Sequence, residues 1–367
     1  MSDCCLPCAR RSWLVGRLSG HIEHSRGDRA AVRTLLALPD DRLLAAVGGE
    51  RRDGLHAELE TLDVPAEMRR WGQQGVFTAC RHSDSYPARL LRLPDPPAAL
   101  HVFGDATTAA GLLEAPAVAL VGARRCSVDG AAMARGLGRG CSAAGVTVIS
   151  GMALGVDAGA HEGALEARGR TLAVLAGGPE RAYPARWRAL HGRIGTTAAV
   201  LSEMPPGTPS YRWGFPARNR IIAALSGLVV VVEARERSGS LITAEIAADL
   251  GVTVGAVPGR PGHPLADAPN ALIRDGAVLV RGCEDVLEEL LGVRAPEAEA
   301  TTLEPELAEV ATIVARGART QDEVAGAAGA VGGVLAALTR LELLGVVERR
   351  GAGRYVPGPT RWKAGPG

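Results

Sequence analysis

The residues best suited to chemistry lie in a short turn that ends with two arginines, Arg124 and Arg125. The apolar run 117–121 before this turn predicts a strand, and residues 129–144 after it predict a helix. A glycine between such elements, here Gly122, lets a phosphate group approach the backbone. The free N–H groups at the helix start and the arginines would both attract that anion. We therefore expect a phosphate-binding turn.

A second cationic group opens another predicted helix, where Arg218 and Arg220 flank Asn219. Positive side chains in the first turn of a helix oppose the helix dipole, and an anionic ligand would remove this conflict. We therefore predict that both arginines face a ligand. The alternative is that they pair with acidic side chains such as Glu203 or Glu233.

A serine-rich helix start forms the third group. Ser238, Gly239 and Ser240 follow a strand predicted over 228–233, and Thr243 lies in the first turn of the next helix. Backbone N–H groups and hydroxyls at such a position form an anion cradle. An ordinary serine N-cap is the alternative. Because all three groups follow strands or open helices, they could share one edge of a sheet.

Arginines and an aromatic residue follow the third predicted strand, at Arg186, Trp187 and Arg188. This combination suits single-stranded nucleic acid, because the cations contact phosphates and the ring stacks on a base. Trp187 is explained equally well as a core residue. Asp157 and His161 share one helix face but have no evident nucleophile beside them, so we interpret them as a turn and helix cap.

Cysteines near the start raise the question of a metal. Cys5 and Cys8 have the spacing of a zinc-finger pair, and His21 and His24 follow. The two histidines are closer together than the finger pattern requires, and Cys4 obscures the ligand set. We therefore predict no metal and keep zinc as the alternative.

The charges are unevenly distributed along the chain of 367 residues, whose formal net charge is +1. From Gly122 to Arg220 there are 13 arginines and 6 acidic residues, whereas from Ile221 to Leu290 there are 5 and 10. A basic centre of this kind favours a polyanionic partner, although folding could instead scatter the charges over a solvated surface.

Targeting signals are missing from the sequence. There is no signal peptide, and no apolar run reaches the roughly 18 residues of a membrane span. The seven cysteines are odd in number. We therefore expect a cytoplasmic protein that keeps its thiols reduced and does not insert into a membrane.

Alternating apolar and helical stretches from 117 to 291 predict an α/β fold with a doubly wound, Rossmann-like sheet. Short leucine-rich helices precede it, and three helices followed by a hairpin come after it. The expected domains are a helical domain over 1–74 (SAM-like or helix-hairpin-helix-like), a Rossmann-like domain over 75–292, a linker over 293–304, a winged helix over 305–357 and a tail over 358–367.

Taken together, these stretches resemble the DNA-processing protein A family (DprA, also called Smf). The resemblance is carried by Val121-Gly122-Ala123-Arg124, Ser150 to Asp157 with His161, Tyr183-Pro184, Ser202-Glu203, Pro206-Gly207, Phe215 to Ile222, Ser238 to Ala244, Pro258-Gly259 and Asn270-x-Leu272-Ile273. It extends from about Ser85 to Leu291.

The resemblance implies a protein without catalytic activity or cofactor. It implies an extended Rossmann-like domain that binds single-stranded DNA, forms a homodimer, protects incoming DNA and loads the recombinase RecA during natural transformation. Family members often carry an asparagine where Trp187 stands. The DNA-binding residues predicted from the motifs and the resemblance are Gly122, Ala123, Arg124, Arg186, Trp187, Arg188, Arg218, Asn219, Arg220, Ser238, Gly239, Ser240 and Thr243.

An enzyme is the alternative. Gly239, Thr243 and Glu245 loosely match the glycine-rich helix start of phosphoribohydrolases resembling cytokinin-activating enzymes. That group carries a Pro-Gly-Gly-x-Gly-Thr run, which is replaced here by Arg237-Ser238-Gly239-Ser240. Release of free base from a nucleoside monophosphate would separate the two interpretations.

Overall fold

The chain folds into two compact units, residues 1–293 and 294–367. The computed structural model describes residues 3–25, 34–292, 301–317, 319–328, 333–358, 360 and 362–365. The first unit is built on a nine-stranded sheet with the order β1-β2-β6-β5-β4-β3-β7-β8-β9. Its strands are β1 (Val76–Cys80), β2 (Ala99–Gly104), β3 (Ala117–Val121), β4 (Thr147–Ser150), β5 (Thr171–Leu175), β6 (Ala199–Ser202), β7 (Leu228–Val231), β8 (Thr253–Ala256) and β9 (Val278–Leu279).

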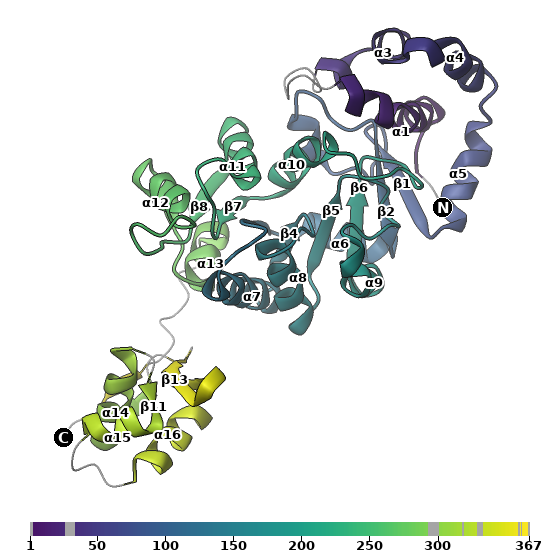
Figure 1. Ribbon diagram of the computed structural model, residues 1–367. Coiled ribbons are helices and arrows are strands. Elements are labelled where there is room, and N and C mark those ends of the chain that lie inside the picture. The colour runs from purple at the N-terminus through teal and green to yellow at the C-terminus, as the bar shows by residue number, and fades with distance from the viewer. Residues whose placement is uncertain are drawn as a thin grey trace. The chain divides into compact units, whose positions relative to one another are not determined.

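Strands β3 to β9 run parallel, whereas β2 is antiparallel to both β6 and β1. The parallel part confirms the predicted Rossmann-like α/β fold (Figure 1). Its helices are α6 (Ala106–Glu114), α7 (Val128–Ala143), α8 (Val156–Glu166), α9 (Arg188–Thr197), α10 (Gly214–Leu225), α11 (Gly239–Asp249), α12 (Asp267–Arg274) and α13 (Cys283–Leu291). The described residues also contain the short 3₁₀ segments η1 (Gly49–Arg51), η2 (Ala88–Arg92), η3 (Ala185–Trp187) and η4 (Gly351–Gly353).

Helices cover both faces of the sheet, which is why β3 is apolar at every position. Val118 and Leu120 pack on one face with residues of α7, α8 and α13. Ala119 and Val121 pack on the other face with residues of α6, α9, α10 and α11. Successive residues of a strand point to opposite faces, so an uninterrupted apolar run fills both layers.

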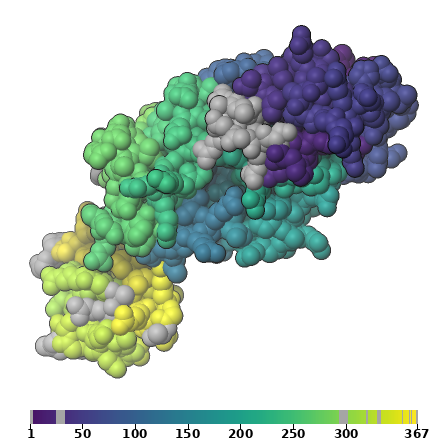
Figure 2. Space-filling view, turned by 45° about the horizontal axis from the view of Figure 1, so that its top comes forward, coloured from purple at the N-terminus to yellow at the C-terminus, as the bar shows by residue number. Residues whose placement is uncertain are grey.

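The N-terminal helices pack within the same unit as the sheet. They are α1 (Leu6–Ser25), α3 (Asp40–Val47), α4 (Arg52–Glu60) and α5 (Val64–Gln73). Leu14 and Leu18 of α1 share a core cluster with Met204 and Trp213, which follow β6. The space-filling view shows this helical layer seated directly on the sheet unit (Figure 2).

Two polar contacts fasten the start of the chain to strands β1 and β2. The buried imidazole of His101 lies 2.7 Å from the Ser12 hydroxyl and 3.0 Å from the Thr78 hydroxyl. The segment before α1 also pairs with β1, because the Asp3 N–H donates to the Thr78 carbonyl at 2.9 Å. These contacts join the beginning of the chain to the antiparallel end of the sheet.

The second unit contains the predicted three helices and hairpin. The helices are α14 (Pro305–Ala315), α15 (Gln321–Ala328) and α16 (Val334–Leu343), and the strands β11 (Arg319–Thr320), β12 (Val347–Arg350) and β13 (Arg354–Pro357) form one sheet. Thr320 and Glu323 exchange the two hydrogen bonds of a capping box at the start of α15. The assignment of this unit as a winged helix stays a prediction.

The predicted linker and tail contain strands that the sequence analysis did not expect. Residues 293–300 of the linker lie outside the described residues, but β10 (Thr301–Leu303) pairs in parallel with β14 (Trp362–Ala364). Leu303 is buried and Trp362 packs against the same core, so these apolar side chains draw both segments onto the second unit. Strands β10 and β14 therefore belong to the second unit, although they lie outside the range 305–357 predicted for the winged helix.

Candidate functional site

A pocket of about 510 Å³ lies at the carboxyl ends of β3 and β7. These strands are neighbours, and the chain continues from them in opposite directions along the sheet. Strands β4 to β6 lie beyond β3, and strands β8 and β9 lie beyond β7. Ligands of doubly wound sheets bind at such a switch point. The pocket is lined by Val121, Gly122, Arg124, Ala153, Asp157, Tyr183, Arg212, Phe215, Pro216, Arg218, Asn219, Ile222, Ser238, Gly239, Ser240, Ile242 and Thr243.

The turn after β3 is held shut by Glu233 rather than left open for an anion. The Ser127 N–H and the Ser127 hydroxyl donate to the two carboxylate oxygens of Glu233, at 2.8 and 2.6 Å. The Ala123 N–H donates to the Glu233 carbonyl at 2.7 Å. The chain's own carboxylate thus occupies the start of helix α7, and phosphate binding by the turn after β3 stays a prediction.

Gly122 is needed for packing at this turn. A Cβ on this residue would lie 2.7 Å from Cγ2 of Val156 and 2.9 Å from the Glu233 carbonyl oxygen. Its lack of a side chain thus lets β3, α8 and the end of β7 meet. Gly122 lines the pocket, whereas Ala123 does not.

Arg124 is exposed and lies beside the Phe215 ring, which in turn packs against Tyr183. Its guanidinium carbon is 5.3 Å from the centroid of the Phe215 ring. The rings of Phe215 and Tyr183 are also 5.3 Å apart, and the Tyr183 side chain is largely exposed. A cation next to accessible rings can contact a phosphate and a neighbouring base together.

The start of helix α11 forms the opposite wall of the pocket. Ser238 caps this helix, and its hydroxyl lies 2.7 Å from that of Ser240. The Asn219 amide donates to the Gly239 carbonyl at 3.2 Å, which fixes α10 against α11. The serine N-cap is confirmed. The anion cradle stays a prediction for these residues, which line the pocket.

Arg218 is buried beneath the pocket floor. Its guanidinium donates to the carbonyl of Gly151, at 2.7 Å, and to the carbonyl of Val174. Burial lowers its pKa to about 10, although nearby Asp157 favours the charged form. Arg218 therefore stays charged at neutral pH and joins the ends of β4 and β5 to α10, while one side of it borders the pocket.

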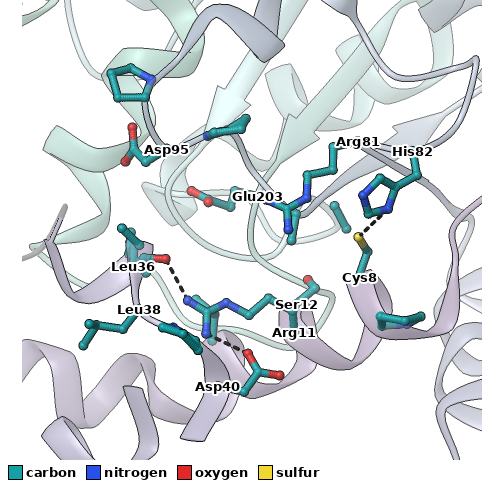
Figure 3. A pocket seen from close by; sticks show the side chains of 18 of the residues that line it. Cys8, Arg11, Ser12, Leu36, Leu38, Asp40, Arg81, His82, Asp95 and Glu203 are labelled. Carbon is teal, nitrogen blue, oxygen red and sulfur yellow. Dashed lines mark hydrogen bonds and ion pairs between the residues drawn. The ribbon is translucent and has the colours of Figure 1, made fainter. Parts of the chain in front are cut away.

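Arg220 does not line this pocket but a different one, and its predicted contact with a ligand stays a prediction. Its guanidinium pairs with Asp95 at 3.0 Å and with Glu203 at 2.8 Å, and all three side chains are largely buried. Pairing with Glu203 was the alternative that the sequence left open. Asp95 and Glu203 border a different cavity, of about 480 Å³, beside α1 (Figure 3).

Arg186, Trp187 and Arg188 follow Tyr183 but are not among the residues that line the pocket. Both arginines are exposed. Trp187 is half-buried and packs against the sheet core. The rings available to a ligand are therefore those of Tyr183 and Phe215, and Trp187 takes the core position.

Asp157 and His161 make contacts within the fold, and Asp157 shapes the predicted turn but lies inside α8 and does not cap it. The Asp157 carboxylate accepts the N–H groups of Gly151 and Ala153, which shapes the loop after β4. His161 is fully buried against the Thr171 hydroxyl at 2.7 Å. Burial, reinforced by the charge of Arg218, lowers the pKa of His161 to about 3, so it remains neutral.

Among the lining residues to which the sequence assigned no binding role, Tyr183, Arg212 and Phe215 carry an aromatic ring or a positive charge. Tyr183 and Phe215 belong to two motifs that carry the family resemblance, Tyr183-Pro184 and the segment from Phe215 to Ile222. Their aromatic rings could have indicated a role in base stacking. Arg212 is exposed just before α10. Of the residues that suggested an enzyme, Gly239 and Thr243 line the pocket, and Glu245 does not.

The metal ligand set proposed as an alternative is also different in the structure. Cys5 and Cys8 lie next to Cys80 and His82, not next to His21 and His24. His24 instead contacts the Gly20 carbonyl within helix α1.

Among the described residues, no helix is long and apolar enough to cross a membrane.

Known proteins share this architecture. The family model for DNA recombination-mediator protein A matches residues 77–291. DNA processing protein DprA of Bacillus subtilis (strain 168) is 38% identical over 227 residues, which are 62% of this chain and 75% of the relative. DNA processing protein DprA of Streptococcus pneumoniae (strain ATCC BAA-255 / R6) is 42% identical over 206 residues, 56% of this chain and 71% of the relative.

Solved structures agree. The X-ray structure of DNA processing protein A from Streptococcus pneumoniae matches with a TM-score of 0.61 at 32% identity, over 77% of this chain and 96% of that chain. A structure of DNA processing protein A from Helicobacter pylori, described for its single-stranded DNA binding mode, matches with a TM-score of 0.52 at 29% identity. It covers 56% of this chain and 93% of that chain.

Proposed function

Because this chain belongs to the DNA recombination-mediator protein A family, we propose that it binds single-stranded DNA in the pocket between β3 and β7 and acts without catalysis in recombination. The observation that carries the proposal is the placement of exposed Arg124 beside the rings of Phe215 and Tyr183. Single-strand sites combine cations that follow the backbone with rings on which bases stack.

Each wall of the pocket has a distinct part in this binding. Arg124 and Arg212 neutralise phosphates, and the capped start of α11 supplies hydroxyl and N–H donors from Ser238 and Ser240. Arg218 and Asn219 hold these walls in place through their contacts with Gly151 and Gly239. Exposed Arg186 and Arg188 extend the basic path beyond the pocket.

The wider role follows from the same family. We propose that the protein protects incoming single strands, loads RecA onto them during natural transformation and works as a homodimer in the cytoplasm. Light scattering of the purified chain tests the dimer. RecA filament formation on oligonucleotides precoated with a single-strand-binding protein tests loading.

The binding site is tested by salt titrations with a labelled oligonucleotide, single-stranded and duplex. Arg124→Ala is expected to weaken single-strand binding and to reduce the log–log salt slope by about 0.7, the value for one lost phosphate contact. Arg168→Ala is the matched control, because this arginine is also exposed but lies far from the pocket. It follows α8, which begins near the pocket and runs back to the amino ends of the parallel strands. Equal binding by Arg124→Ala and wild type at every salt concentration would refute this site.

The absence of catalysis is tested separately. The protein is incubated with nucleoside monophosphates and free base is measured by chromatography. Steady release of base that Thr243→Ala abolishes would contradict the binding-only proposal, because Thr243 is the pocket residue shared with the phosphoribohydrolase pattern.

A further inference from the structure

Four metal-binding side chains from two distant parts of the chain converge beside α1. Cys5 precedes this helix, Cys8 lies in its first turn, Cys80 ends β1 and His82 follows in the next turn. Their ligand atoms all lie within 4.8 Å of one another. Figure 3 shows Cys8 on its helix and His82 on the facing loop, pointing toward each other. We propose that these residues bind a structural zinc ion.

Three of the six distances between the ligand atoms are close to those of a tetrahedral site. Bonds of about 2.3 Å to sulfur and 2.0–2.1 Å to nitrogen place the ligand atoms of a zinc tetrahedron roughly 3.5–3.8 Å apart. The sulfur atoms of Cys80 and Cys5 are 3.7 Å apart. Nδ1 of His82 lies 3.4 Å from the sulfur of Cys5 and 3.4 Å from that of Cys8. The other three pairs of ligand atoms lie within 4.8 Å of one another.

The ligand types select zinc and a structural role. Three thiolates and one imidazole form a complete four-ligand shell, which is typical of closed structural zinc sites rather than of catalytic ones. Thiolates disfavour magnesium and calcium, which take oxygen ligands. The Cys5 N–H donates to the Cys80 sulfur at 3.3 Å, an outer contact that orients a coordinating thiolate.

The other close cysteine pair shows that proximity of sulfur alone does not make such a site. The sulfur atoms of Cys141 and Cys283 lie 3.6 Å apart between α7 and α13. In the part of the chain that the structure describes, this pair belongs to no group of three or more potential ligands, whereas the group beside α1 has four. Bound zinc would tie α1 to the end of β1, two segments about 75 residues apart.

The test is the metal content of the full chain, purified under reducing conditions. Elemental analysis is expected to find one zinc per chain. Cys8→Ser and His82→Ala are expected to reduce it to background, whereas Cys4→Ser and His24→Ala retain it. Loss of zinc from Cys4→Ser and His24→Ala as complete as from Cys8→Ser would overturn the proposed ligand set.

Cobalt gives a second measurement on the wild-type chain, independent of whether a variant folds. Chain reconstituted with Co²⁺ is expected to show the intense visible bands of a tetrahedral thiolate site. His82→Cys is expected to keep the metal and to strengthen the sulfur-to-cobalt charge-transfer band. Absence of bound zinc after reconstitution, or the weak spectrum of octahedral cobalt, refutes the site. Neither readout depends on DNA binding, so this proposal and the proposed function can fail separately.

Discussion

The carboxylate of Glu233 binds Ser127 at the first turn of helix α7, with one oxygen accepting the backbone N–H and the other the hydroxyl. Gly130 makes room for this contact, since a Cβ there would collide with the carboxylate. Two helices, α7 and α11, thus begin at the carboxyl ends of the parallel strands, and their first turns differ in what they contact. That of α7 is filled by a side chain of the protein, and that of α11 faces the pocket.

Glu233→Gln is expected to destabilise the fold. It removes the negative charge from two short hydrogen bonds at a helix N-terminus, where charge-assisted bonds and the helix dipole both favour it, so we expect a loss of about 1–3 kcal/mol. Urea denaturation measures this loss. Glu236→Gln, at an exposed position three residues later, is the control and should unfold like wild type.

Gly151→Ala is expected to disturb both stability and DNA binding. A Cβ on Gly151 would collide with the Arg218 guanidinium, so the arginine must move from beneath the pocket. Overpacking of this kind costs about 1–3 kcal/mol. Gly136→Ala, on the exposed face of α7 with free space around it, should instead stabilise the protein by about 0.5–1 kcal/mol. A denaturation curve of Gly151→Ala that coincides with wild type would contradict the described packing.

Leucine substitutions at Phe215 and Tyr183 separate stacking from charge. Each should weaken single-strand binding by about 1–3 kcal/mol for a stacked base and leave the salt slope unchanged, because no cation is lost. Fluorescence titrations at several salt concentrations measure both quantities. Trp187→Leu should mainly lower the free energy of unfolding, since Trp187 packs against the sheet core. An affinity loss confined to Trp187→Leu would reverse these roles.

Two buried histidines predict acid sensitivity. Burial lowers the pKa of both His101 and His161 to about 3. The unfolded chain, with a histidine pKa near 6.5, therefore binds more protons, and stability falls as the pH drops from about 6.5 toward 3. Each histidine should cost about 2 kcal/mol between pH 6.5 and pH 5. Urea midpoints across this range measure the effect, and His161→Gln should flatten the curve while a control at exposed His263 should not.

The strand and helix pattern was predictable because strands β3 to β7 are buried at every position and leave apolar runs in the sequence. Side-chain partners were harder to predict, because they depend on tertiary neighbours. Arg218 and Arg220 looked equivalent in sequence. Residues two positions apart on a helix point about 200° away from each other, so one borders the pocket and the other pairs with Glu203 on the far side.

The other differences between the predicted and the observed site arise from contacts between segments that are far apart in the sequence. Ser127 and Glu233 are 106 positions apart, so the sequence could not show that the turn after β3 is closed. The Cys5 and Cys8 pair was visible, but its nearest histidines in sequence lie further along the same helix. Cys80 and His82 become their neighbours only when β1 takes its place in the sheet.

Strand β1 ends the sheet, and an edge strand exposes unpaired N–H and carbonyl groups that can recruit a strand from another molecule. Here the segment before α1 covers part of that edge, since Asp3 bridges to Ala79 and donates to the Thr78 carbonyl. The residues before the first helix therefore shield part of the β1 edge from pairing with a strand of another molecule. We expect that trimming or tagging this segment would lower solubility through the exposed edge of β1, independently of anything the pocket binds.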